Sequence, residues 1–389
     1  MRMALHRLFI ILVMRGRYPP VIWCHSVTHV MIQIRKVLFS VLFSGTYMIP
    51  RSVAVVRVAS LLRFARCTES LGAPSEHLLA ASGIPVELLD HPSAAVSLEN
   101  AFKFGEKACK AADTEHLGLY VGMQTSLDDL GPVGEKLKRS TTVHDYLCQA
   151  IALYNKLVTG ACIWLSDQGD EIRLNVATMG EGSLAPYQSQ LETLAITVVA
   201  LRQALGRDWS PDALGLTYRS REDFPENSCF EGSRILQGAQ TSYIAIPRGA
   251  LAAPFPCANR QSEPGADTID THTLSGDLAG LVQHQVDTLL GAKGLHIDTV
   301  AESLMMSRRS LQRCLAEDGT SYSELLADTR MHKAMNQLQV TDEPIMEIAL
   351  ALGYANASNF TRAFKARAGV SPQSFRRLAN SDPSVSRLH

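Results

Sequence analysis

The sequence predicts an α+β domain followed by an all-α domain. Strand-like alternation of apolar and polar residues occurs only in the first two-thirds of the chain, mixed with helical segments, and helical spacing alone occurs after it. Between the two lies a segment with Pro264, Gly265, several Ser and Thr and almost no large apolar residue, which is typical of a linker. We therefore place an α+β domain at 50–257, a linker at 258–275, an all-α domain at 276–379 and a disordered tail at 380–389.

A basic leader precedes the first domain. The 389-residue chain has a formal net charge of -1, yet ten Lys and Arg and no acidic residue precede Glu69. The apolar runs at 8–14 and 37–49 are shorter than the roughly 20 residues of a membrane-spanning helix, and no signal-peptide cleavage site follows the first. We expect this basic apolar leader, residues 1–47, to lie outside the working fold, with a natural start at Met48. A membrane-associated anchor is the alternative.

Three helices are predicted in the α+β domain, at 53–71, 97–112 and 184–205. Apolar residues recur there with helical spacing, and Gly72 and Gly206 end the first and the third.

Strands are predicted between and after these helices. Ile172, Leu174 and Val176 alternate with polar residues after a Gln-Gly-Asp turn, which predicts a hairpin over 161–178. Short strands are expected at 214–218 and 242–246, and we expect the strands to be antiparallel.

Seven helices are predicted after the linker, separated by short breaks at Gly or Pro. Ser321 and Glu324 form a capping box, which satisfies two free backbone donors at a helix start. Pro372 occupies the first turn of the last helix, where its missing N–H costs nothing. The predicted helices run over 277–290, 298–304, 308–317, 321–338, 345–352, 357–367 and 372–379.

Two parts of the all-α domain, 298–317 and 345–367, share one design. Each has a short helix, a turn and a second helix rich in Arg, which is the anatomy of a helix-turn-helix unit whose second helix enters the major groove of DNA. The 12 basic and 12 acidic residues of 276–389 cancel, yet 307–316 and 355–381 contain no acidic residue. These two stretches would therefore present basic surfaces to a polyanion such as DNA.

Helical spacing separates the core of the first unit from its outer face. Leu311 and Leu315 are expected to pack inward with Cys314, so Arg309, Gln312 and Arg313 point outward together. Arg can bind guanine, and Gln can bind adenine, through two hydrogen bonds each.

The second unit shows the same division. Phe360 and Phe364 are expected to pack inward, which leaves a polar face opposite them. The outward residues are Ser358, Thr361, Arg362 and Lys365.

Several motifs connect this domain to a known family. They are Ser307-Arg-Arg-Ser-Leu-Gln-Arg313, Gly319-Thr-Ser-Tyr-Ser-Glu-Leu-Leu326 with Arg330 and Ala334, Ile348-Ala-Leu-Ala-Leu-Gly-Tyr354, Ser358-Asn-Phe360, Arg362-Ala-Phe364 and Gly369-Val-Ser-Pro372. With these motifs, residues 293–379 resemble the DNA-binding domain of AraC-type (AraC/XylS) transcriptional regulators. The resemblance implies two helix-turn-helix units that are joined by a long helix at about 321–339 and enter successive segments of the major groove.

The resemblance also implies which residues face the DNA. Base-facing positions are Arg309, Gln312 and Arg313 in the first unit, and Ala357, Ser358, Thr361 and Arg362 in the second. We predict as DNA-binding residues Ser307, Arg308, Arg309, Gln312 and Arg313, together with Ala357, Ser358, Thr361, Arg362 and Lys365.

Two positions depart from the family pattern. Met305 stands where the family usually has Gly, which predicts an adjusted first turn. Ala357 stands at a position that is often polar, which predicts that the second unit reads sequence less directly and depends more on backbone contacts.

The first domain resembles the arabinose-binding-like sensor domain of one branch of AraC-type regulators. The similar features are Leu130-Gly-Pro-Val133, the helix that follows it and the hairpin. The resemblance implies binding of a small-molecule effector, and dimerisation, but identifies no ligand-binding residue. Tyr146, Tyr154 and Trp164 are either pocket residues or, as aromatic side chains more commonly are, core residues.

Motifs for catalysis are missing. Gly131-Pro-Val-Gly-Glu-Lys136 is too short for a phosphate loop and has no Ser or Thr after Lys136. The eight cysteines lie far apart without the spacing of a zinc site, so we expect reduced thiols, no metal and no cofactor.

The sequence therefore predicts a cytoplasmic transcription factor, not an enzyme, that binds specific double-stranded DNA at promoters under the control of a small-molecule effector. A homodimer and RNA polymerase are the further partners considered. A membrane-associated or an effector-independent regulator with the same DNA-binding domain is the alternative.

Overall fold

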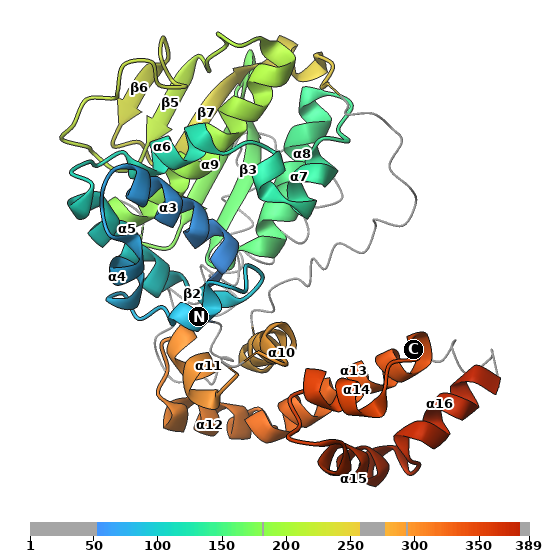
Figure 1. Ribbon diagram of the computed structural model, residues 1–389. Coiled ribbons are helices and arrows are strands. Elements are labelled where there is room, and N and C mark those ends of the chain that lie inside the picture. The colour runs from blue at the N-terminus through green and yellow to red at the C-terminus, as the bar shows by residue number, and fades with distance from the viewer. Residues whose placement is uncertain (1–52, 181–182, 257–276, 293–294, 382–389) are drawn as a thin grey trace, which may run out of the picture. The chain divides into compact units, whose positions relative to one another are not determined.

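The computed structural model describes residues 53–180, 183–256, 277–292 and 295–381 (Figure 1). The predicted leader at 1–47 and linker at 258–275 lie outside these residues, as does the predicted tail beyond Ser381. The chain folds into two compact units. Of the described residues, the first unit contains 63–78 and 102–256, and the second contains 53–62, 79–101 and 277–381.

The first unit is built on a five-stranded sheet in the order β3-β4-β7-β5-β6. Its strands are β3 (Ala161–Asp167), β4 (Glu171–Thr178), β5 (Ala213–Leu216), β6 (Arg234–Gln237) and β7 (Ser242–Pro247). The predicted hairpin is β3–β4, in which Ile163 pairs with Val176. One expectation was wrong, because β5 and β6 are parallel. Strand β6 escaped the sequence analysis since it is a four-residue edge strand and mostly exposed.

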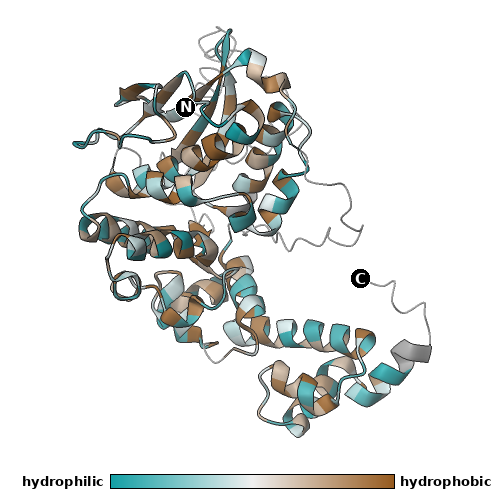
Figure 2. Cartoon of the chain, turned by 45° about the horizontal axis from the view of Figure 1, so that its top comes forward, coloured by the Kyte–Doolittle hydropathy of each residue, from teal (hydrophilic) through white to brown (hydrophobic). Residues whose placement is uncertain are grey.

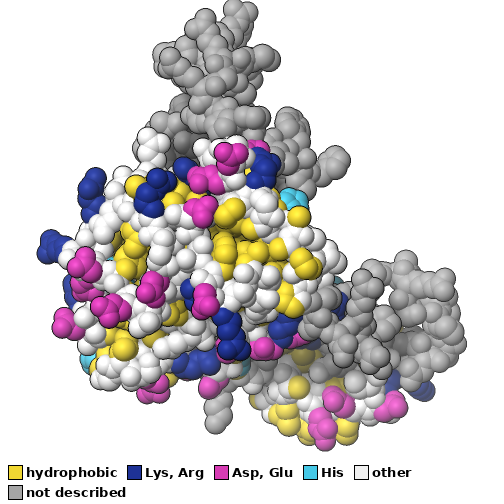
Figure 3. Space-filling view, turned by 90° about the horizontal axis from the view of Figure 1, so that it is seen from above, with side chains coloured by type: hydrophobic (Ala, Val, Ile, Leu, Met, Phe, Trp, Pro, Cys, Tyr) yellow, Lys and Arg dark blue, Asp and Glu magenta, His cyan; other side chains and the backbone are white. Residues whose placement is uncertain are grey.

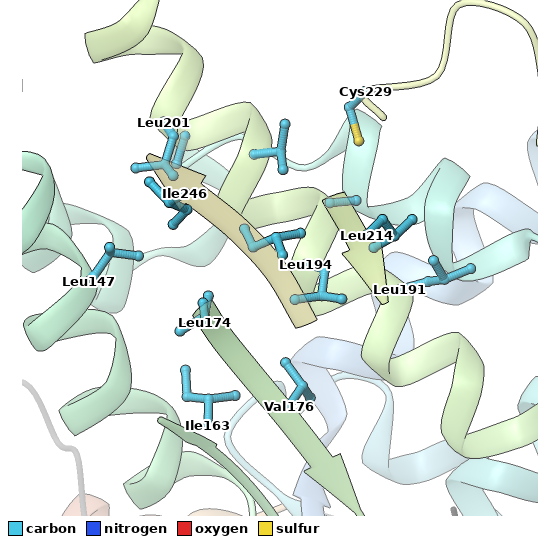
Figure 4. Packing of buried hydrophobic residues seen from close by; sticks show 14 of the residues in the cluster. Leu147, Ile163, Leu174, Val176, Leu191, Leu194, Leu201, Leu214, Cys229 and Ile246 are labelled. Carbon is cyan, nitrogen blue, oxygen red and sulfur yellow. The ribbon is translucent and has the colours of Figure 1, made fainter. Parts of the chain in front are cut away.

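Helices α6 (Leu117–Gln124), α7 (Pro132–Leu137), α8 (Val143–Leu157) and α9 (Leu184–Leu205) complete this unit. Helix α9 has the predicted bounds and lies against the sheet, with α8 next to β3 (Figure 1). Their apolar side chains and those of the sheet interlock in the main core, where Leu174, Leu191 and Ile246 are at most 1% exposed (Figure 4). The unit thus has a hydrophobic core of its own.

The segment between residues 53 and 111 is shared between the units. It contains β1 (Val55–Arg57), α3 (Val58–Ser70), α4 (Ser75–Ala80), the short 3-10 helix Val86–Leu88, β2 (Ala95–Ser97) and α5 (Leu98–Ala111). The helix predicted from residue 53 begins only at Val58, because Val55–Arg57 pairs with β2 in an antiparallel ribbon. A run of β-branched residues favours such a strand.

The second unit contains the helices predicted after the linker. They are α10 (Leu278–Leu289), α11 (Ile297–Ser303), α12 (Arg308–Glu317), α13 (Tyr322–Val340), α14 (Ile345–Ala351), α15 (Ala357–Ala368) and α16 (Pro372–Ser381). Hydrophobic and hydrophilic residues alternate around these helices with helical spacing (Figure 2). Two separate clusters of buried residues divide the unit, one around α10–α12 and one around α14–α15.

Helix α6 packs closely on α9 through two glycines. A Cβ atom on Gly118 would lie 2.0 Å from the carbonyl oxygen of Gln188, and one on Gly122 would lie 2.5 Å from the Cβ atom of Ala195. Such distances require the helix backbones to separate, so no larger residue fits here without a shift.

We expect Gly118→Ala to lower the free energy of unfolding of the first unit by about 1–3 kcal/mol, the usual cost of overpacking. Urea unfolding followed by tryptophan fluorescence would measure it. Gly105→Ala on α5 is the control: nothing lies within 4 Å of its added Cβ, so the helix should gain about 0.5–1 kcal/mol. Equal effects of the two changes would contradict the close packing.

Candidate DNA-binding site

The first helix-turn-helix unit consists of α11, a turn and α12. Leu304, Leu311 and Leu315 are buried in its core as the spacing predicted, and Cys314 is 5% exposed. Ser307 caps α12 by accepting a hydrogen bond from the backbone N–H of Ser310 at 3.1 Å. The cap fixes where α12 begins and so which side chains its first turns present to solvent.

The turn of the first unit keeps its geometry although it lacks the usual glycine. Met305 has a left-handed backbone with a φ of 56°, and the N–H of Met306 donates to the carbonyl oxygen of Ala301 at 2.8 Å. In the second unit Gly353 has a φ of 74°, and Tyr354 donates to Ala349 at 2.9 Å. The expected adjustment of the first turn was wrong: the methionine instead adopts a conformation that costs about 1–2 kcal/mol in an L-residue.

The predicted reading residues of α12 share one exposed face. Arg309, Gln312 and Arg313 are all exposed. Arg308 is 3.4 Å from Asp298 through its Nη1 atom, and the Nε atom of Arg313 is 3.8 Å from the Oε1 atom of Glu317. These are long, solvent-exposed ion pairs of little strength, which leave the guanidinium groups able to turn toward another anion.

The second unit buries an aromatic cluster beneath its recognition helix α15. Phe360 and Phe364 are each 1% exposed and have their ring centroids 5.7 Å apart. Tyr354 packs on Phe360, and Phe375 of α16 packs on Phe364. Asn356 caps α15 by accepting a hydrogen bond from the N–H of Asn359. The buried rings therefore fix the orientation of α15 from its core side.

The opposite side of α15 carries a shallow, open depression. All five residues predicted for the second unit line it, together with Ala366: Ala357, Ser358, Thr361, Arg362 and Lys365. Arg362 donates from Nη2 to the Oδ1 atom of Asn359 at 2.8 Å, a contact that the sequence analysis did not anticipate. The structure thus brings together on one surface all the side chains predicted for this unit.

Helix α13 holds both units. Leu325 of its first half belongs to the core of the first unit, whereas Ala334 and Leu338 belong to the core of the second. Its 19 residues give it a length of about 28 Å, close to the roughly 34 Å of one turn of DNA. Helix α13 therefore packs into the cores of both units along its length.

Arg330 of α13 fixes the turn of the second unit. Its Nε atom donates to the carbonyl oxygen of Leu352 at 2.9 Å and its Nη2 atom donates to that of Gly353 at 3.0 Å, while the guanidinium lies 4.7 Å from the ring centroid of Tyr354. Arg330 was noticed in the sequence only as part of a motif, and its positioning role could not be read from helical spacing.

The sequence stretches that carry the predicted residues differ in charge from the face shown in Figure 3. On the face shown in Figure 3, acidic and basic side chains are interspersed. The stretches 307–316 and 355–381 contain no acidic residue at all. Among the described residues, no group of three or more His, Cys, Asp or Glu could hold a metal ion.

The aromatic residues singled out in the first domain do not form one site. Tyr146 is 2% exposed and stacks on Phe255 with ring centroids 4.8 Å apart, and burial raises the pKa of its phenol. Tyr154 is half-buried against the same core, while Trp164 lies half-buried on β3 outside it. Tyr146 is therefore a core residue.

Two family models match the chain. The arabinose-binding domain found at the N-terminus of AraC transcription regulators matches residues 72–255, and a helix-turn-helix domain matches residues 300–378. The chain belongs to the AraC-type transcriptional regulators. It is a DNA-binding regulator with an arabinose-binding-like N-terminal domain, which favours effector control over the effector-independent alternative.

Relatives of this AraC-type regulator extend over most of its length. An ornithine utilization regulator of Pseudomonas aeruginosa is 27% identical over 321 residues, which is 78% of this chain and 91% of that protein. An uncharacterized HTH-type transcriptional regulator of Mycobacterium tuberculosis is 24% identical over 323 residues, covering 79% and 92%. Among solved structures, the transcriptional regulator CdpR of Pseudomonas aeruginosa is 22% identical, with a TM-score of 0.30 and coverage of 67% and 86%.

Every helix in the described part of the chain is too short or too polar to cross a membrane.

Replacing Met305 by Gly should stabilise the compact unit that contains α10–α16 by about 1 kcal/mol, because glycine adopts the left-handed backbone without the clash of a Cβ atom. The side chain of Met305 is 41% exposed, so its removal sacrifices little packing. Thermal unfolding followed by circular dichroism would measure the gain.

Met305→Ala is the matched control, since it removes the same side chain and keeps the Cβ atom. A gain of equal size in both variants would show that the backbone conformation is not the cause.

Proposed function

We propose that this regulator reads promoter DNA through two surfaces of its second unit. Arg309, Gln312 and Arg313 would contact base edges from α12, with Ser307 and Arg308 contacting the adjoining backbone. On α15 the corresponding residues would be Ala357, Ser358, Thr361, Arg362 and Lys365. What carries the proposal is that both sets lie on capped helices and that their charged side chains are exposed. The acidic side chains beside the first set, Asp298 and Glu317, form only weak, solvent-exposed ion pairs with Arg308 and Arg313.

The two surfaces would contribute differently to specificity. Arg309, Gln312 and Arg313 can each make paired hydrogen bonds to a base, whereas Ala357 offers only a methyl group at the start of α15. Arg362 is already hydrogen-bonded to Asn359. The first helix-turn-helix unit would therefore select the DNA sequence, and the second helix-turn-helix unit would gain more of its affinity from contacts with phosphates.

The N-terminal domain would bind a small-molecule effector. Its support is the match to an arabinose-binding domain over 72–255 together with a core that is separate from those of the DNA-binding helices. We keep the effector-binding domain at 50–257, the linker at 258–275 and the DNA-binding domain at 276–379, although residues 53–62 and 79–101 belong to the same compact unit as the DNA-binding helices. One relative is named for ornithine utilization. Amino acids are therefore the ligands to test, beginning with L-ornithine.

The proposal includes a homodimer that acts in the cytoplasm, where promoter DNA lies, and that contacts RNA polymerase once it is bound. A dimer would place four helix-turn-helix units on one promoter. Light scattering of the free chain and of its DNA complex would test the dimer.

Arg309→Ala should weaken binding of the selected site by about 1–3 kcal/mol and relax the base preference at one position. The site would be a duplex that the full chain selects from a random pool, and titration by fluorescence anisotropy would give the affinity. Arg207→Ala is the control. Arg207 is exposed and lies in the compact unit that contains the five-stranded sheet, so its replacement should leave both the affinity for the duplex and the base preference unchanged. Unchanged binding by both Arg309→Ala and Arg313→Ala would overturn the assignment of α12.

An effector should raise the melting temperature of the full chain, because a ligand that binds only the folded state stabilises it by about 2.7 kcal/mol at one hundred times its dissociation constant. A panel of amino acids beginning with L-ornithine would be screened by thermal shift. A true effector must also change the affinity for the selected duplex. If ligands bind without altering DNA affinity, effector control by those ligands is excluded.

A further inference from the structure

The DNA-binding unit includes a two-stranded ribbon from far upstream in the sequence. Among the described residues, strands β1 and β2 pair with each other and with no other strand, and both belong to the same compact unit as α10–α16. Val55 and Ala95 are fully buried and join the cluster formed by α10, α11 and α12. The hydrophobic core of the first helix-turn-helix unit is therefore completed by residues that precede it by more than 200 positions in the sequence.

Gln285 of α10 bonds the edge of this ribbon as a third strand would. Its Oε1 atom accepts from the N–H of Ala95 at 2.7 Å, and its Nε2 atom donates to the carbonyl oxygen of the same residue at 2.7 Å. Next to it, the Nε2 atom of His284 lies 2.9 Å from the carbonyl oxygen of Ser93. Gln285 is fully buried, so losing these bonds would leave polar groups unsatisfied in the core.

The same amide reaches the helix-turn-helix unit. The Nε2 atom of Gln285 also donates to the Oγ atom of Ser303 at 2.9 Å, and Ser303 in turn donates to the carbonyl oxygen of Val300. Ser303 is the last residue of α11 and stands two positions before Met305, whose left-handed turn sets the direction of α12. A continuous hydrogen-bonded path therefore runs from the ribbon to the last turn of α11, directly before the turn at Met305.

The ribbon does not cover the exposed face of α12 that is proposed to contact DNA. Arg309, Gln312 and Arg313 remain exposed with the ribbon in place. Strand β2 contacts α10 and α11, so an influence of the ribbon on DNA binding would act through the position or the stability of these helices.

The ribbon is also continuous with helices that belong to the other unit. Strand β1 leads directly into α3 at Val58, and β2 leads directly into α5 at Leu98. Both helices begin in the second unit and end in the first. The chain thus enters the DNA-binding unit through the ribbon as well as through the segment before α10.

We propose that the β1–β2 ribbon is the element that couples the N-terminal domain to the first helix-turn-helix unit, with Gln285 as the positioning residue that joins them. The inference rests on the proposed effector control, since it describes the route by which an effector would alter DNA binding. Coupling is reciprocal, so DNA binding must in turn change the ribbon.

Hydrogen exchange of the full chain, with and without the duplex selected from a random pool, tests this reciprocity. We expect DNA to slow exchange at Ala95 and its ribbon neighbours by about fivefold or more, as coupling of ordinary strength requires. If DNA protects α12 and leaves the ribbon unchanged in the wild-type chain, the proposal is overturned.

Gln285→Ala, compared with Gln283→Ala, identifies the residue that carries the coupling. Gln283 lies on the same helix, but its Nε2 atom donates to the Oγ1 atom of Thr329 at 2.8 Å and not to the ribbon. We expect Gln283→Ala to keep the DNA-induced protection of the ribbon and Gln285→Ala to lose it while α12 stays protected. Retained protection in Gln285→Ala would refute the role of Gln285. Should Gln285→Ala fail to fold, the wild-type exchange still decides on the ribbon.

The two proposals fail in different ways. Absence of an effector appears in the ligand screen as no change of melting temperature or DNA affinity, and it does not affect exchange in the DNA complex. Absence of coupling appears as an unprotected ribbon whether or not an effector is found.

Discussion

Both recognition surfaces depend on one shared helix. Helix α13 contributes Leu325 to the core of the first helix-turn-helix unit and Ala334 to that of the second, so neither core is complete without it. Lys333 adds a bond from its Nζ atom to the carbonyl oxygen of Asp287, and Arg330 holds the second turn. Because protein cores pack densely and resist small shifts, this helix holds the two helix-turn-helix units at a fixed separation.

Net charge is a poor guide to DNA binding in this molecule. The helical domain is neutral, but its acidic residues sit on helices such as α11, α13 and α14, and α15 has none. Several acidic side chains form ion pairs with basic side chains: Asp328 contacts Arg367 at 2.6 Å, and Asp287 contacts Lys333 at 3.1 Å. Such pairs connect α13 to α15 and to α10, and they partly neutralise the acidic side chains that take part in them.

Local signals predicted the helices well and long-range contacts poorly. The spacing of apolar residues predicted α12 at 308–317 and α9 at 184–205, and both bounds agree with the structure. Strand β1 was taken for helix because its pairing partner lies 40 residues away, beyond any local pattern. The bonds from Gln285 to Ala95 span 190 residues, and a lone Gln on a helix carries no sign of such a contact. The exposed sites were predictable because exposure on a helix follows from its periodicity alone.

The ribbon beneath α10 limits how such a regulator can evolve. Sensor and DNA-binding domains are often regarded as modules that recombination can exchange at a linker. In this protein, a gene fusion made between residues 257 and 276 would remove Val55 and Ala95 from the DNA-binding unit. The core around Val300 would then lose two of its buried residues, and Gln285 would lose its hydrogen-bond partner Ala95. A new sensor would have to supply an equivalent ribbon, so the two domains are expected to be inherited together and to change in step.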